Sequence, residues 1–242
     1  MRGKMLIVYG LSVCYLLLIG YKALNFFPIQ SSIFCSRDFF VMMMYPQWYV
    51  LFFLLPIIIT TICFTKHDFL LMSVLQYRSW KSLVWKQQKT LWIQAVVYTL
   101  MFMGLCFFYT NHMKLSNWEQ LGSYFYQKTQ SVIEIGNVEF FCLIFVLCFI
   151  RNYIMMQIVI LSIWKKGTPI YGVLCLCCIF GIEVVSIQYT LLFRLFTMDY
   201  IVWKEQSLRI RAVVGVVVYS VLILMSWYRV IKKKEWLRHE TI

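Results

Sequence analysis

Charged side chains are scarce in this sequence. Asp, Glu, Lys and Arg make up 14% of its 242 residues, whereas hydrophobic residues make up 62%. Acidic residues are the rarer kind, with 10 Asp and Glu against 23 Lys and Arg. Long polar stretches are also missing, and a folded domain usually needs at least about 50 residues. The chain therefore leaves no room for a soluble domain of conventional size.

Nucleotide-binding and metal-binding motifs are missing as well. The sequence has no G-x-x-x-x-G-K-[S/T] loop, and therefore no signature for binding ATP. Its three histidines, His67, His112 and His239, are scattered over loops and ends. Apart from Cys35, the cysteines fall in apolar stretches, and the cluster at 175–178 lacks the second Cys pair or the nearby His of zinc sites. We expect no metal and no cofactor in this chain.

The same scarcity argues against a membrane-embedded enzyme. An intramembrane protease needs paired carboxylates, or a catalytic residue with a His partner at matching depth. Glu183 is alone in its apolar stretch, and no His lies in any such stretch. We interpret the chain as a non-enzyme and keep an enzyme as the least favoured alternative.

Six apolar stretches occupy most of the chain, at residues 5–21, 46–65, 91–109, 138–164, 170–193 and 212–231. A bilayer core of about 30 Å needs about 20 apolar residues in a helix. Backbone groups in hydrocarbon must bond internally, so these stretches must be helical. The first lacks an A-x-A-like cleavage site and is interpreted as a retained helix. The sequence predicts an all-α polytopic membrane protein, a single domain over 1–242 with six transmembrane helices.

The placement of the basic residues predicts the orientation. More Lys and Arg residues lie on the side of the N-terminus than on the other side, so the positive-inside rule puts both termini in the cytoplasm. The Lys run at 232–234 fits an anchor that meets anionic lipid, not a nucleic-acid site. We expect a multi-pass protein of the plasma membrane that binds no nucleic acid.

The cytoplasmic segment 66–90 is too polar to cross a bilayer but rich in large apolar residues. Apolar residues recur at helical spacing on one face, and basic and aromatic residues follow on the next. The first set is Trp80, Leu83 and Val84, and the second is Lys81, Trp85 and Lys89. Such a helix rests on the membrane surface or presents a face to a soluble partner, and the pattern leaves both open.

Two opposite charges, Arg151 and Glu183, interrupt the fourth and fifth apolar stretches. Each lies about 20 Å along its helix from the turn at 165–169, so a helical hairpin places both at one depth. A lone charge at the bilayer centre costs at least about 2.5–3.5 kcal/mol. We predict that the two side chains form an intramembrane ion pair.

Polar residues continue from Glu183 at helical spacing, which predicts one polar face. The set is Glu183, Ser186, Thr190, Arg194 and Thr197. Such a face should avoid lipid. Two interpretations stay open: Glu183 clamps two helices together, or the whole face lines a substrate path that opens outward.

The pattern of spans and charge resembles small ABC-2-type permeases of Gram-positive bacteria, which are half-transporters of the type V exporter kind. The shared features are six spans, both ends inside, a proline (Pro56) in the second span, and an R-x-W-K-x-x-x-W-K stretch before the third. Many such subunits belong to exporters of antimicrobial peptides or to bacteriocin and lantibiotic immunity systems. The resemblance implies a peptide or another amphipathic substrate.

The resemblance also implies partners. A separate ABC ATPase would bind ATP and Mg²⁺ and dock on a coupling helix in the 66–90 loop, and a second permease half would complete a homodimer or heterodimer. The implied docking residues are Arg78, Trp80, Lys81, Trp85, Lys86 and Lys89. A re-entrant segment is implied over 195–210, and 110–137 is expected to be a polar outer loop. A non-transporting immunity factor or a channel stays the alternative.

Overall fold

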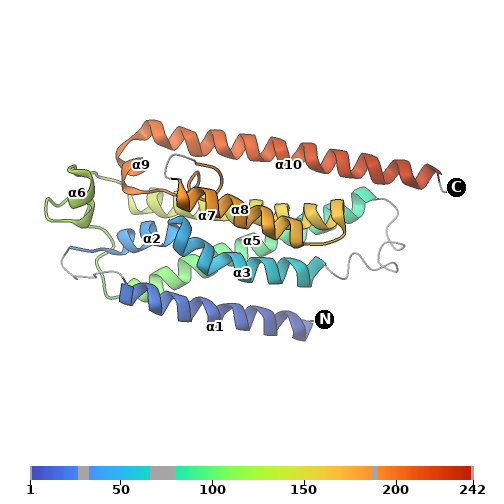
Figure 1. The fold of residues 1–242 in the computed structure, drawn as a ribbon. Coiled ribbons are helices and arrows are strands. Elements are labelled where there is room, and N and C mark those ends of the chain that lie inside the picture. The colour runs from blue at the N-terminus through green and yellow to red at the C-terminus, as the bar shows by residue number, and fades with distance from the viewer. Residues whose placement is uncertain (1, 27–32, 66–79, 187–189, 241–242) are drawn as a thin grey trace.

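The computed structural model describes residues 2–26, 33–65, 80–186 and 190–240, and the regular structure in these ranges is helical throughout (Figure 1). The all-α prediction is confirmed. The helices are α1 (Arg2–Phe26), α2 (Ser36–Met44), α3 (Pro46–Thr65), α5 (Trp80–Thr110), α6 (Tyr124–Thr129), α7 (Asn137–Lys166), α8 (Ile170–Val185), α9 (Tyr200–Lys204) and α10 (Gln206–Glu240).

Four helical stretches in the described ranges are long and apolar enough to cross a membrane. They are Pro46–Thr65, Lys81–Thr110, Asn137–Lys166 and Ile210–Lys232. Two further apolar helical stretches, Ile7–Ala23 and Ile170–Val185, are shorter. By length and composition the helices fit a membrane-embedded protein, whereas the count of six spans stays a prediction.

The N-terminal part of α5 corrects one expectation. Residues 80–90, predicted to belong to a separate coupling loop, are the first turns of the same helix that crosses the bundle. The 31 residues of α5 span about 46 Å, well beyond the about 30 Å of a bilayer core. Leu83 and Val84, predicted on one face, are both buried against the protein. Residues 66–79, including Arg78, lie outside the described ranges.

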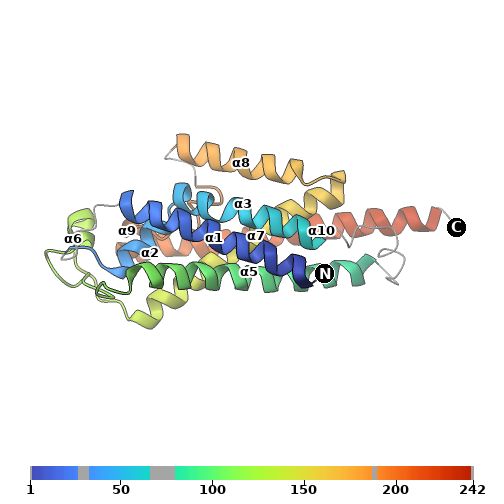
Figure 2. The same cartoon turned by 90° about the horizontal axis from the view of Figure 1, so that it is seen from below.

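Helix α7 is the centre of the bundle and packs against α5, α8, α3 and α10. Helix α1 covers α3 and α5, and α10 lies on the opposite side of the bundle (Figure 1). Both chain ends lie at one end of the bundle, together with the start of α5 and the turn between α7 and α8. Helices α2, α6 and α9 lie at the other end, as Figure 2 also shows.

The predicted polar loop over 110–137 instead builds a structured end cap, formed by α2, residues 111–136 and α9. Its core is aromatic: Trp118 is fully buried and stacks on Phe125, with 4.6 Å between the ring centroids. Trp203 of α9 is also fully buried and stacks on Phe140 at 4.8 Å. Aromatic rings bury large apolar areas, so this cluster holds three distant segments together.

Two charged residues of α2 join the cap to its neighbours. Asp38 accepts hydrogen bonds from the backbone N–H of Cys35 and from the indole N–H of Trp118, both at 2.9 Å. Arg37 donates to the carbonyl of Ile135 at 2.7 Å. Burial raises the pKa of the Asp38 carboxyl, and the hydrogen bonds from Cys35 and Trp118 oppose that shift.

Removal of the Asp38 carboxylate is expected to loosen the cap. Asp38→Ala leaves the buried N–H groups of Trp118 and Cys35 without an acceptor, at about 1–3 kcal/mol for each unsatisfied group. Thermal unfolding of the purified protein in detergent measures the loss. Glu119→Ala, an exposed carboxylate beside Trp118, is the control and should unfold like the parent chain. Equal midpoints for the two variants would contradict the role of Asp38.

Candidate functional site

Glu183 lies in the last turn of α8, and its side chain determines where the helix stops. Its two carboxylate oxygens accept hydrogen bonds from the backbone N–H groups of Leu191 at 2.7 Å, Phe193 at 2.8 Å and Arg194 at 3.1 Å. The chain therefore folds back on itself after Val185, and Ser186 follows in an extended conformation. The expected helix over 170–193 is wrong at its C-terminal end, where Ser186 and residues 190–193 are not helical, because Glu183 binds backbone groups that a continuing helix would have used internally.

Arg151 of α7 approaches the same segment from the other side. Its guanidinium donates to the carbonyls of Met44 at 3.0 Å and Phe193 at 3.2 Å, and lies 3.2 Å from the centroid of the Tyr49 ring. It also reaches the hydroxyl of Thr197 at 3.4 Å. The side chain is fully buried. Arg151 therefore ties α7 to the end of α2 and to residues 193–197.

The predicted direct ion pair is wrong. The hydrogen bonds of Arg151 and Glu183 do not join the two side chains; both meet the peptide groups of Phe193 instead. Phe193 donates its N–H to Glu183 and offers its carbonyl to Arg151. The helical-hairpin prediction did place the two charged side chains near each other, since both bind Phe193. A non-helical backbone inside the bundle has unpaired N–H and C=O groups, and each charge satisfies one kind.

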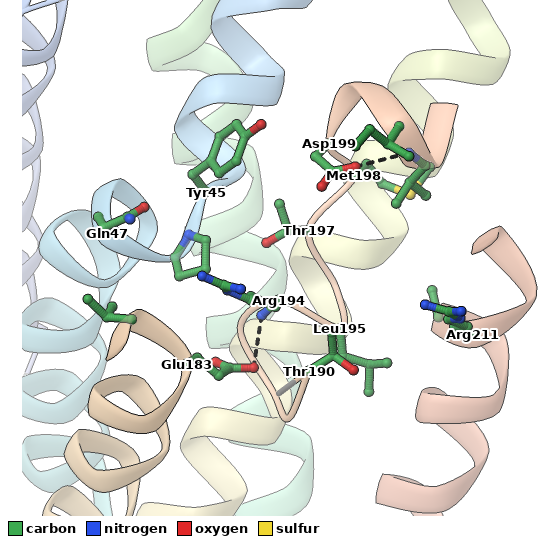
Figure 3. A pocket seen from close by; sticks show the side chains of 15 residues that line it. Tyr45, Gln47, Glu183, Thr190, Arg194, Leu195, Thr197, Met198, Asp199 and Arg211 are labelled. Carbon is green, nitrogen blue, oxygen red and sulfur yellow. Dashed lines mark hydrogen bonds between the residues drawn. The ribbon is translucent and has the colours of Figure 1, made fainter. Parts of the chain in front are cut away.

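The polar residues after Glu183 do not share one helical face, because α8 stops at Val185. The fold nevertheless gathers most of them around one cavity (Figure 3). Those that line it are Glu183, Thr190, Arg194 and Thr197, whereas Ser186 is not among its lining residues. The segment 195–210, predicted to be re-entrant, contains an irregular stretch, the short helix α9 and the start of α10.

This cavity, named here the polar cavity, has a volume of about 380 Å³. Its polar lining also includes residues from three other places in the chain: Tyr45 and Gln47 where α2 meets α3, Asp199 before α9, and Arg211 of α10. Figure 3 shows Arg211 across the cavity from Glu183 and Gln47. The volume of the polar cavity falls in the range of about 300–1,000 Å³ that is typical of small-molecule pockets.

The acidic groups of the polar cavity are already hydrogen-bonded to backbone. Glu183 holds three N–H groups, and Asp199 accepts from the N–H of Val202 at 3.0 Å, which caps α9. Burial and the nearby Asp199 raise the pKa of Tyr45 to about 12, so its hydroxyl stays protonated at neutral pH. Arg211 is exposed and makes no hydrogen bond or ion pair within the described ranges. The arrangement favours an anionic group in the cavity.

The predicted docking residues lie at the other end of the bundle. Lys81, Trp85, Lys86 and Lys89 are exposed on the first turns of α5, and Trp85 keeps 73% of its surface exposed. Trp80 begins that helix. The exposed basic face formed by Lys81, Trp85, Lys86 and Lys89 is named here the α5 face. The docking residues therefore lie toward the opposite end of the bundle from α9 and the starts of α3 and α10, which line the polar cavity (Figure 1).

A hydrogen-bonded network between the two ends was missed at the sequence level. Tyr153 donates to the amide oxygen of Gln88 at 2.6 Å, Gln157 bonds to Gln88 as well, and Trp227 donates to Gln157 at 2.8 Å. This network joins α5, α7 and α10. Its signal in the sequence was Gln157, an amide side chain inside the apolar stretch 138–164, where a polar group needs a partner.

No family model, curated protein or solved structure matches the chain. Among the described residues, no group of three or more His, Cys, Asp or Glu side chains is placed to hold a metal ion.

Proposed function

We propose that this chain is the membrane-spanning subunit of an ABC-2-type exporter, driven by a separate ATPase. The observation that carries the proposal is the α5 face, where a tryptophan that is 73% exposed stands among three lysines. Exposed Trp and basic residues together are typical of protein-binding surfaces. The face lies at the end of the bundle where both chain ends lie, the end with the exposed Lys165 and Lys166. The positive-inside rule predicts that this end is cytoplasmic.

A physical path connects the α5 face to the polar cavity. A displacement of α5 acts on α7 through Gln88, Tyr153 and Gln157. Helix α7 in turn holds the segment 193–197 through Arg151, and this segment lines the cavity. In the proposed cycle, ATP hydrolysis on the partner moves α5, and the cavity changes its access to the outside.

The substrate proposed is a peptide or another amphipathic molecule that leaves the cell through the plasma membrane of a Gram-positive bacterium. A second permease half, identical or related, completes the transporter, and ATP and Mg²⁺ bind to the ATPase. These parts rest on the resemblance in sequence pattern.

Purification tests the proposal. A tagged copy of the chain, extracted from its own membranes in mild detergent, is expected to elute with a subunit that hydrolyses ATP. An autonomous immunity factor or channel would elute without such a subunit. It would also keep its activity in cells from which the ATPase gene has been deleted, and that result would contradict the proposal.

A further inference from the structure

The polar cavity continues into an apolar groove along α10. The groove has a volume of about 480 Å³ and shares Thr190, Leu195 and Arg211 with the polar cavity. Its floor follows α10 at a spacing of four residues, through Ile210, Val214, Val218 and Leu222. From the first to the last of these is about 18 Å along the helix, more than half of a bilayer core of about 30 Å.

The junction of the two spaces holds a cation, Arg211, that has no partner among the described residues. Arg211 lines both of them, is exposed, and has no hydrogen bond or ion pair in the part of the chain that is described. A second guanidinium, that of Arg194, lines the polar side. The carboxylates of Glu183 and Asp199 on that side already bind backbone N–H groups. Those carboxylates bind backbone and make no ion pair with Arg211 in the described ranges, so the guanidinium N–H groups of Arg211 are available to an anion.

The position of Arg211 in the bilayer fits a lipid head group. It lies one residue inside the apolar stretch Ile210–Lys232, at the boundary where long basic side chains reach the head groups. From there the groove runs along α10 into the hydrocarbon, in the direction that an acyl chain takes. A free anion would not need an apolar groove of this length.

We propose that the polar cavity and the α10 groove together bind one membrane lipid with an anionic phosphate head group. The phosphate oxygens accept hydrogen bonds from Arg211, whose planar guanidinium matches a phosphate in geometry. One acyl chain lies over Val214 and Val218. This binding needs no ATPase and no transport, so its test is independent of the proposed function.

The first part of the test addresses the head group. Native mass spectrometry of the delipidated full chain in detergent measures how much of each of two added lipids stays bound. Phosphatidylglycerol is expected to be retained in preference to phosphatidylcholine with the same acyl chains. Arg211→Gln should weaken the retention of phosphatidylglycerol roughly tenfold, the loss of one charged hydrogen-bonding group. Arg229→Gln changes an exposed arginine at the far end of α10 and should retain the lipid like the parent. Equal retention of both lipids by parent and Arg211→Gln overturns the proposal.

The acyl-chain arm compares two neighbouring valines. Val218→Trp fills the groove and should lower lipid retention, whereas Val217→Trp, whose parent side chain is 57% exposed and outside the groove lining, should not. Glycerol 3-phosphate, which carries the head-group chemistry without chains, should not displace the lipid. Displacement by it at lipid-like concentrations would identify a free-anion site and overturn the proposal. Thermal unfolding of each variant confirms that it is folded.

Discussion

Glu183→Ala is expected to be among the most destabilising single substitutions in the chain, with a loss of at least about 3 kcal/mol. The variant leaves the backbone N–H groups of Leu191, Phe193 and Arg194 without their acceptor, and each unsatisfied buried group costs about 1–3 kcal/mol. The fold of the segment after α8 depends on these three bonds. Thermal unfolding in detergent measures the effect, and Glu205→Ala, an exposed glutamate after α9, is the matched control.

Exchanging the two charges distinguishes bonds from Arg151 and Glu183 to the backbone from a direct ion pair between them. In Arg151→Glu/Glu183→Arg, a carboxylate would face the carbonyls of Met44 and Phe193, and a guanidinium would face N–H groups. Both contacts are repulsive, so the double variant should be at least as unstable as either single one. A double variant that recovers the stability of the parent would restore the direct pair and contradict the contacts described.

The second large effect is expected at the α5 face. Trp80→Ala with Trp85→Ala should abolish association with the ATPase while the chain still inserts into the membrane, because aromatic anchors carry much of the energy of such interfaces. A pull-down of the ATPase with the tagged variant measures the loss. Trp92→Ala is the control: it lies two helical turns beyond Trp85 on the same side of α5, and Trp92 is 54% exposed.

The long apolar helices were the part of the fold that could be predicted from the sequence. The stretch 46–65 coincides with α3, and 138–164 falls within α7. Uniformly apolar runs of this length have one stable state in hydrocarbon, so local composition is sufficient. The length of α5 was underestimated, because its first turns are polar and the predicted stretch began only at residue 91. A change from apolar to polar residues marks where a helix leaves the membrane, and the helix itself can continue beyond that point.

The end of α8 could not be predicted, because the residues after Glu183 stay mostly apolar up to Phe193 and contain no proline or glycine that would end a helix. Their fold depends on a side chain that binds N–H groups eight to eleven residues later, which is a tertiary contact. The end cap was missed for a similar reason. Trp118 and Trp203 are far apart in the sequence, and no periodicity links them before the fold brings them together.

Most residues of the candidate site could be predicted from the sequence, whereas their arrangement in space could not. Residues of the predicted polar face do line one cavity, although a fold-back of the chain gathers them there, not a single helix. Arg211 and Tyr45 were missed because they come from other parts of the chain, the first turns of α10 and the residue between α2 and α3. For Arg211, the signal in the sequence was an Arg at the boundary of the last apolar stretch, 212–231.

Photo-crosslinking from the α5 face tests the central claim most directly. A photoreactive phenylalanine analogue at position 85, activated in native membranes, is expected to crosslink the chain to a nucleotide-hydrolysing subunit. The same analogue at position 92 should crosslink to lipid or to this chain only. Crosslinks to lipid alone from both positions would mean that no ATPase docks on α5, and would contradict the account of this protein as an ATP-driven exporter subunit.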